Sequence, residues 1–241
     1  MDIDSKVAIV TGASRGLGAA FSKALIDEHA LFVYGIARHT ADLFSLQKDL
    51  GSRFIPVQLD ICHQDEVKMW IANTFSDKLL PDILINNAGI GYFRRIDEMS
   101  TEEWSAMINT NLNGLYYITS EIVKLMLKKK DSSHIINIGS ILGTTARSEA
   151  TAYCATKYGV NGFSEALFKE LRGDNIKVTC INPGSVETDF FKNSGTEAHN
   201  NILQPKDIAN TLIHVLKTPD NMLINELTIR PLNPKAPVPV K

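Results

Sequence analysis

The sequence predicts a single α/β domain in which helices flank a doubly wound parallel sheet. Three observations lead to this fold class. Short apolar runs alternate with longer amphipathic segments, the runs are rich in β-branched residues with little polar alternation, and no repeat or linker divides the 241 residues. Such runs are typical of strands covered on both faces, and their alternation with helices predicts parallel strands joined by right-handed crossovers.

The expected elements follow in chain order from these patterns. The first apolar run leads through a glycine-rich turn into an amphipathic segment, and similar successions recur along the chain. Ser100 and Glu103 have the spacing of a capping box, which predicts the start of the fourth helix. Helices are expected at about 16–28, 40–50, 64–77, 101–129, 152–172 and 206–216. Strands are expected at Val7–Val10, Leu31–Ile36, Phe54–Val57, Ile83–Ile85, Ile135–Ile138, Val178–Ile181 and Leu227–Ile229.

The domain is expected to span residues 1–230, with a substrate loop at about 185–204 and a tail at 231–241. The loop contains Gly195 and little apolar periodicity, which favours a lid. The tail is rich in proline, so it cannot join a sheet or helix and favours an extended form. A loosely ordered end is the simplest interpretation of the tail. Docking across a subunit interface and recognition of a partner are the alternatives.

Composition argues against several classes of function. A net charge of −2 provides no electrostatic attraction to nucleic acid or to an anionic membrane. Three widely spaced cysteines without a C-x-x-C pair indicate reduced thiols, and the six histidines lack metal-ligand spacing, so no metal site is expected. The sequence contains no signal-peptide pattern and no apolar run of about 18 residues. We therefore expect a cytoplasmic protein.

A glycine-rich turn follows the first expected strand. Its spacing is G-x-x-x-G-x-G, with Gly12, Gly16 and Gly18. Glycines in such a turn let the backbone approach a pyrophosphate, and the N-terminus of the following helix attracts the phosphates. A purely structural turn is the alternative. The position of the motif in the first βαβ unit favours dinucleotide binding on a Rossmann-like sheet.

Three polar residues in the second half of the chain have the pattern of an acid–base site. Tyr153 and Lys157 are four residues apart, hence on one face of a helix, and Ser140 follows the strand Ile135–Ile138. A cation beside a tyrosine favours the phenolate, so Lys157 is expected to lower the pKa of Tyr153. A serine hydroxyl nearby could hold a substrate oxygen. The alternative is a buried tyrosine, an exposed lysine and an ordinary turn serine.

Taken in order, these motifs resemble those of the classical short-chain dehydrogenase/reductase family, and the likeness runs nearly end to end. The glycine turn has that family's own spacing. The resemblance implies an oxidoreductase that interconverts a small carbonyl compound and its secondary alcohol or hydroxy acid by hydride transfer. The further matches are Asp60-Ile61, Asn86-Asn87-Ala88-Gly89, Asn111, the interval of 13 positions from Ser140 to Tyr153, and Pro183-Gly184 with Thr188.

The resemblance also implies roles for individual residues. Tyr153 would be the acid or base, and Lys157 would lower its pKa and hold the nicotinamide ribose. Ser140 would orient the substrate oxygen, and Asn111 would support a proton relay through water. Gly139 stands where many members have a second serine, which leaves the catalytic set intact. The residues expected to contact the coenzyme are Gly12, Ser14, Arg15, Gly16, Leu17, Gly18, Arg38, Asp60, Ile61, Asn87, Ala88, Gly89, Tyr153, Lys157, Pro183, Gly184, Val186 and Thr188.

Two alternatives to this function remain open from the sequence. An epimerase or dehydratase of the extended relatives would carry an added substrate domain, for which little sequence remains after residue 190. A non-catalytic dinucleotide sensor would be expected to lack Tyr153, Lys157 or Ser140. The family resemblance implies a homodimer or homotetramer that uses the helices near 101–129 and 152–172. The final segment has a slight likeness to the branch that acts on serine or 3-hydroxy acids.

The end of the second expected strand predicts NADP as coenzyme, with NAD less favoured. NAD-binding proteins place an acidic residue there for the ribose hydroxyls, whereas this chain has Ala37 followed by Arg38. Arg15 lies in the glycine turn, and two guanidinium groups can hold a 2′-phosphate. Two ordinary surface arginines are the alternative. In the loop before Tyr153, Arg147 could pair either with a substrate carboxylate or with Glu149.

Overall fold

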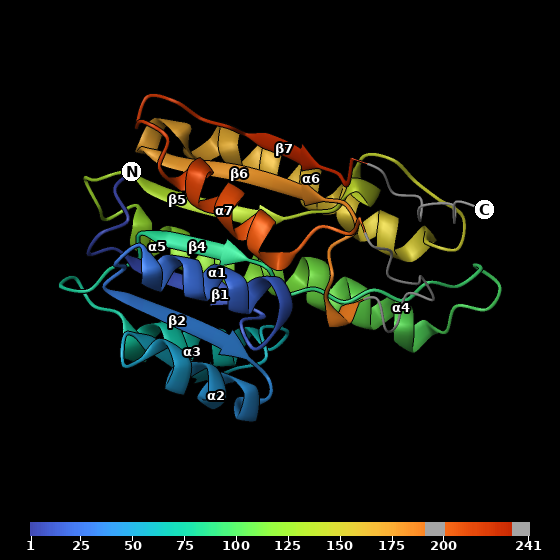
Figure 1. Ribbon diagram of the computed structural model, residues 1–241, viewed down its shortest axis with the longest axis horizontal. Helices are drawn as coiled ribbons and strands as arrows, with labels where there is room; N and C mark the ends of the chain where they lie inside the picture. The colour runs from blue at the N-terminus through green and yellow to red at the C-terminus, as the bar shows by residue number, and fades with distance from the viewer. Residues whose placement is uncertain (191–200, 233–241) are drawn as a thin grey trace, which may run out of the picture.

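The core of the protein is a sheet of seven parallel strands. The computed structural model describes residues 1–190 and 201–232. Every strand pair is parallel, and the strand order is β3-β2-β1-β4-β5-β6-β7. Figure 1 shows the strand arrows pointing the same way, toward the end of the molecule that carries α4. The strands are β1 (Val7–Thr11), β2 (Phe32–Ala37), β3 (Phe54–Gln58), β4 (Ile83–Asn86), β5 (Ser133–Ile138), β6 (Ile176–Pro183) and β7 (Glu226–Ile229).

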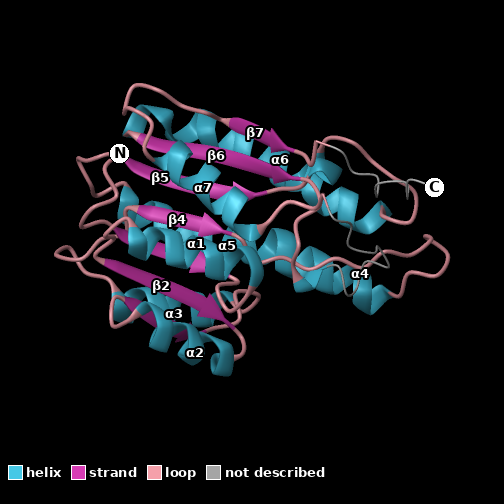
Figure 2. Ribbon diagram, in the orientation of Figure 1, coloured by secondary structure: helices cyan, strands magenta, loops and turns pink. Residues whose placement is uncertain are grey.

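Helices cover both faces of the sheet (Figure 2). One apolar layer packs α1, α2 and α7 on one face and includes Leu25 and Leu212; the other packs α3, α5 and α6 on the opposite face and includes Ile118. Ile9 and Val10 of β1 belong to different layers, as the period of a strand requires. The helical elements are α1 (Gly16–Asp27), α2 (Thr40–Leu50), α3 (Gln64–Thr74), α4 (Thr101–Ile108), η1 (Asn109–Gly114), α5 (Leu115–Met126), η2 (Ile141–Gly143), α6 (Thr151–Leu171), η3 (Arg172–Asp174) and α7 (Pro205–Leu216).

The structure departs from the expected elements mainly within residues 101–129. We expected one continuous helix there, but the chain forms α4, then the π-helical segment η1, then α5. A π-helical turn accommodates an extra residue and is frequent at functional sites. The predicted capping box is confirmed, since the Ser100 side chain accepts from the Glu103 amide and the Glu103 carboxylate accepts from the Ser100 amide. The third helix ends at Thr74 rather than near residue 77.

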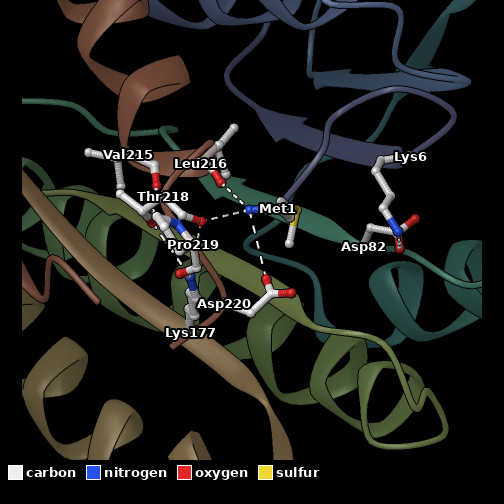
Figure 3. Close-up of polar contacts among 9 residues, drawn as sticks. All are labelled: Met1, Lys6, Asp82, Lys177, Val215, Leu216, Thr218, Pro219 and Asp220. Atoms are coloured by element: carbon white, nitrogen blue, oxygen red, sulfur yellow. Dashed lines mark hydrogen bonds and ion pairs between the residues drawn. The ribbon is translucent and has the colours of Figure 1, made fainter. Parts of the chain in front are cut away.

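Buried charged groups lie at the amino-terminal ends of the strands (Figure 3). Lys177, near the start of β6, donates to the main-chain oxygens of Thr218 and Pro219 beyond the end of α7. Asp82, just before β4, accepts a hydrogen bond from the amide of Val7 and pairs with Lys6. These charges are satisfied by protein groups, so this end of the sheet is a structural junction.

The expected substrate loop and tail are described only in part. Residues 191–200 of the loop and 233–241 of the tail lie outside the described residues. The two ends of the loop are joined, because Val186 and Leu203 form a parallel bridge and Gln204 donates to the carboxylate of Glu187 at 2.7 Å. Among the described helices, none has the length and apolar character needed to cross a membrane.

Candidate active site

The glycine-rich turn joins β1 to α1 at the carboxyl ends of the central strands. Gly12 and Gly16 have positive φ angles of 65° and 55°, which glycine adopts without strain. A Cβ atom on Gly18 would lie 2.1 Å from the oxygen of Gly12, and one on Gly12 would lie 2.9 Å from Cα of Ala88. Side chains at Gly12 and Gly18 would therefore fill the space that the turn encloses, which we call the glycine cradle. Its backbone and the N-terminus of α1 therefore fit the pyrophosphate of a dinucleotide.

The turn is fastened to the segment that follows β4. The hydroxyl oxygen of Thr11 accepts hydrogen bonds from the amides of Asn87 and Ala88, both at 3.0 Å. The side chain of Asn87 donates back to the main-chain oxygens of Thr11 and Gly12, at 3.0 and 3.2 Å. The strand order reverses between β1 and β4, and open parallel sheets bind ligands outside such a point.

Other residues expected at the coenzyme gather around this point. The methyl group of Thr188 lies 3.2 Å from the Cβ position of Gly16, so the segment after β6 reaches the turn. Arg38 and Asp60 both act electrostatically on Cys62, which places them in one neighbourhood. The remaining residues of the expected set occupy the turn and α1 (Ser14, Leu17), the segments after β3 and β4 (Ile61, Gly89), and the end of β6 with the residues after it (Pro183, Gly184, Val186).

Arg15 is the N-cap residue of α1, and its side chain is largely exposed. Its guanidinium lies 3.8 Å from the carboxylate of Asp189. An exposed ion pair of this kind contributes little free energy, so a phosphate could displace it at small cost. The structure thus leaves Arg15 able to take part in coenzyme binding.

Ser140, Tyr153 and Lys157 meet at the carboxyl end of β5. Tyr153 and Lys157 are one turn apart on α6, and each is 6% exposed. The ammonium of Lys157 donates to the main-chain oxygen of Ile138 at 2.8 Å and lies 5.7 Å from the centre of the Tyr153 ring. The Ser140 side chain acts on the ionisation of the Tyr153 hydroxyl, which places the two groups in one neighbourhood. The three residues singled out in the sequence therefore form one cluster.

Burial governs the ionisation of this cluster. Burial raises the pKa of Tyr153 well above its usual value, and the Ser140 side chain opposes the rise. Burial likewise lowers the pKa of Lys157 to about 8, against a smaller opposing effect from Cys180. The net pKa of Tyr153 is therefore raised, whereas the sequence predicted that it would be lowered, because loss of hydration on burial is the largest influence on the phenol. At neutral pH the tyrosine holds its proton.

Asn111 connects the segment after β4 to α6. It lies in η1 and is 2% exposed. Its side-chain oxygen accepts from the amide of Ile90, and its side-chain nitrogen donates to the oxygen of Ile90 and to the hydroxyl of Thr156, all within 3.0 Å. A Cβ atom on Gly89 would lie 3.4 Å from the Asn111 side-chain oxygen and 3.7 Å from the Lys157 ammonium. Asn111 therefore borders the same site.

Asn182 holds Ser140 in place, a role that the sequence reasoning missed. Its side-chain oxygen accepts the Ser140 amide at 3.0 Å, and its nitrogen donates to Asn161 and Glu226 at 3.0 and 3.1 Å. A Cβ atom on Gly139 would lie 1.9 Å from the Asn182 oxygen, which explains why glycine stands there. An asparagine in a buried apolar strand was the available signal, because such a group needs hydrogen-bond partners.

An aromatic wall borders Tyr153. The Tyr153 ring lies 5.3 Å from that of Phe93 and 5.5 Å from that of Phe190, measured between ring centres. Tyr92 and Leu142 pack in the same cluster, so this side of the site is largely apolar. Arg147 lies over the outer part of this wall, 4.8 Å from the centre of the Phe93 ring. The described residues contain no group of three or more side chains suited to hold a metal ion.

Comparisons with known proteins agree with this geometry. A family model described as short chain dehydrogenase matches residues 6–199. Dehydrogenase/reductase SDR family member 11 of Bos taurus is 35% identical over 94% of this chain and 96% of its own, and 3-oxoacyl-[acyl-carrier-protein] reductase FabG of Chlamydia trachomatis is 36% identical over 83% and 82%. A closed serine dehydrogenase complexed with NADP⁺ has a TM-score of 0.88 at 31% identity, covering 98% of this chain and 99% of that one.

Proposed function

The chain belongs to the short-chain dehydrogenase/reductase family of oxidoreductases, and we propose that it is an NADP-dependent enzyme that interconverts a small carbonyl compound and its secondary alcohol or hydroxy acid. The observation that carries this proposal is the convergence of Tyr153, Ser140 and Lys157 beside the glycine cradle. A proton-transfer group next to a dinucleotide surface is the arrangement that hydride transfer to a carbonyl needs.

The chemistry of this cluster follows from its ionisation. When bound, the coenzyme supplies or accepts the hydride. Ser140 holds the substrate oxygen beside the Tyr153 hydroxyl. As the carbonyl is reduced, Tyr153 donates its proton to that oxygen, which it can do because its raised pKa keeps it protonated. Lys157 stabilises the resulting tyrosinate, Asn111 supports the relay that returns a proton from solvent, and in oxidation the proton moves the opposite way.

The choice of NADP rests on the end of β2. The strand ends at Ala37, so no carboxylate is present there to repel a 2′-phosphate or to bind both ribose hydroxyls. Arg38 follows and is exposed, and the ion pair that Arg15 forms within the described structure is a weak one at the surface. Guanidinium groups bind phosphate with paired, charge-assisted hydrogen bonds. The serine dehydrogenase neighbour is a complex with NADP⁺, which supports the same choice.

Coenzyme turnover with a panel of carbonyl compounds and hydroxy acids tests this function. The protein should oxidise NADPH with at least one small carbonyl and prefer it over NADH by about 10-fold or more in kcat/KM, the scale of a lost charge-assisted phosphate contact. Ala37→Asp should remove most of that preference through repulsion of the 2′-phosphate. Binding of coenzyme without any turnover would indicate a dinucleotide sensor. Equal or better efficiency with NADH would overturn the NADP assignment.

The proposed assembly is a homodimer or homotetramer of a cytoplasmic enzyme whose catalytic domain spans residues 1–230. Trp104 of α4, Tyr116 of α5 and Tyr158 of α6 are large apolar residues that stay exposed in the single chain. Exposed residues of this type on neighbouring helices support an interface between subunits. A light-scattering mass equal to that of one 26.6 kDa chain at micromolar concentration would contradict the assembly.

A further inference from the structure

Three arginines lie in the two loops that follow β4 and η2, near the aromatic wall, and they differ in their partners. Arg94 lies 3.7 Å from the carboxylate of Glu103, and Arg95 lies 3.1 Å from that of Asp97. Arg147 makes no ion pair within the described part of the chain. Unlike its two neighbours, this cation has no carboxylate partner among the described residues.

Arg147 is exposed to solvent, and its guanidinium stacks on the aromatic wall. Its guanidinium carbon lies 4.8 Å from the centre of the Phe93 ring, and that ring lies 5.3 Å from the Tyr153 ring. The guanidinium is therefore no farther than about 10 Å from the tyrosine ring. Stacking on an aromatic face leaves the N–H groups at the edge of the guanidinium plane free to bind a carboxylate in a bidentate manner.

The loop that carries Arg147 is held at both ends. Asn161 donates to the main-chain oxygen of Gly143 at 2.9 Å, and Ala150 is fully buried at the start of α6. Glu149 has a φ angle of 59°, a conformation that costs a non-glycine residue free energy and persists only where surrounding structure imposes it. The ion pair with Glu149 that the sequence also suggested is not formed in the described structure. The loop thus holds in place a cation that has no carboxylate partner in residues 1–190 and 201–232.

We propose that Arg147 binds a carboxylate of the substrate, so that the enzyme acts on a hydroxy acid and the matching oxo acid in preference to neutral compounds. This inference rests on the proposed function. The net charge of the chain is −2, so the protein as a whole does not attract anions, and a local cation is required. The Phe93 ring excludes water from one face of the guanidinium, which strengthens its attraction for an anion.

A substrate pair that differs only in charge tests the proposal: 3-hydroxybutyrate and its methyl ester, assayed as kcat and KM with NADP⁺. Wild type should prefer the acid. Arg147→Ala should raise KM for the acid about 10- to 100-fold, the scale of a lost charge-assisted contact, with kcat little changed. The ester should change by less than about 3-fold. Arg147→Lys should recover part of the affinity, since it keeps the charge but not the paired donors.

Arg95→Ala is the matched control, because it removes a cation from the same aromatic-wall region whose charge is already paired. It should leave both substrates unaffected. Propionate and propionamide, as inhibitors competing with the substrate, provide a second measurement: only propionate should bind more weakly to Arg147→Ala. Equal changes for acid and ester, or no preference for the acid in wild type, would overturn the carboxylate-binding role of Arg147 but not the proposed function. No turnover of either compound or of any in the carbonyl panel would overturn the proposed function as well.

Discussion

Two lysines are buried at opposite ends of the same sheet, and their surroundings differ. Lys177 is 7% exposed at the amino end, and its ammonium donates to two main-chain oxygens and lies near the hydroxyl of Thr218 (Figure 3). Lys157 is 6% exposed at the carboxyl end, and its ammonium donates to one main-chain oxygen. Burial lowers the pKa of both. The two side chains are almost equally exposed, but they differ in how many of their N–H donors are used by the protein.

The difference shows how the ends of a parallel sheet divide structural and chemical roles. At the amino end, Lys177 ties the start of β6 to the chain beyond α7, and its donors are used by the protein itself. At the carboxyl end, within the described structure, two of the three N–H donors of Lys157 have no acceptor and lie near Tyr153 and Gly89. Unused donors on a buried cation suit it to bind a ligand.

Among the predicted changes at the carboxyl end of the sheet, removal of the Tyr153 hydroxyl should reduce activity most. Tyr153→Phe should lower kcat by about 10³- to 10⁴-fold, because proton transfer contributes on that scale. The dissociation constant of NADPH, measured by fluorescence titration, should change by less than about 3-fold, since only the transferable proton is lost. Near-normal kcat in this variant would show that another group moves the proton.

Matched substitutions of the two lysines test the comparison directly. Lys157→Met should lower kcat/KM by about 10²- to 10³-fold and weaken coenzyme binding, because it removes the cation beside Tyr153. Lys177→Met should leave kcat/KM within about 2-fold and lower the free energy of unfolding by about 1–3 kcal/mol, because buried carbonyls lose their donor. Urea denaturation and steady-state kinetics on both proteins measure these outcomes. Loss of activity in folded Lys177→Met would mean that the amino end of the sheet also contributes to catalysis, and not to stability alone.

A smaller effect is expected in the pH dependence of the free energy of unfolding. Lys157 has a pKa of about 8 in the folded protein against 10.5 for the ordinary side chain, so between these values the unfolded chain binds more protons than the folded one. Stability should therefore rise with pH across that window. Relative to Lys157→Met, wild type should gain on the order of 2–3 kcal/mol between pH 7 and pH 10. Parallel curves for the two proteins would contradict the depressed pKa of Lys157.

The sequence by itself determined the features that depend on neighbouring residues. The apolar runs predicted all seven strands to within about two residues, because strands covered on both faces exclude polar side chains. The capping box at Ser100 and Glu103 needs only a fixed local spacing, and it formed as expected. The spacing of Tyr153 and Lys157 on one helix likewise placed both on a common face.

Only the tertiary structure decided the features that depend on residues far apart in the chain. Asn182 occupies the space beside Gly139 because β5 and β6 are neighbours in the sheet. The π-helical segment η1 interrupts the expected helix where Asn111 bonds to Ile90 and Thr156. The raised pKa of Tyr153 was not predicted from the sequence, because the loss of hydration on burial depends on everything packed around the ring.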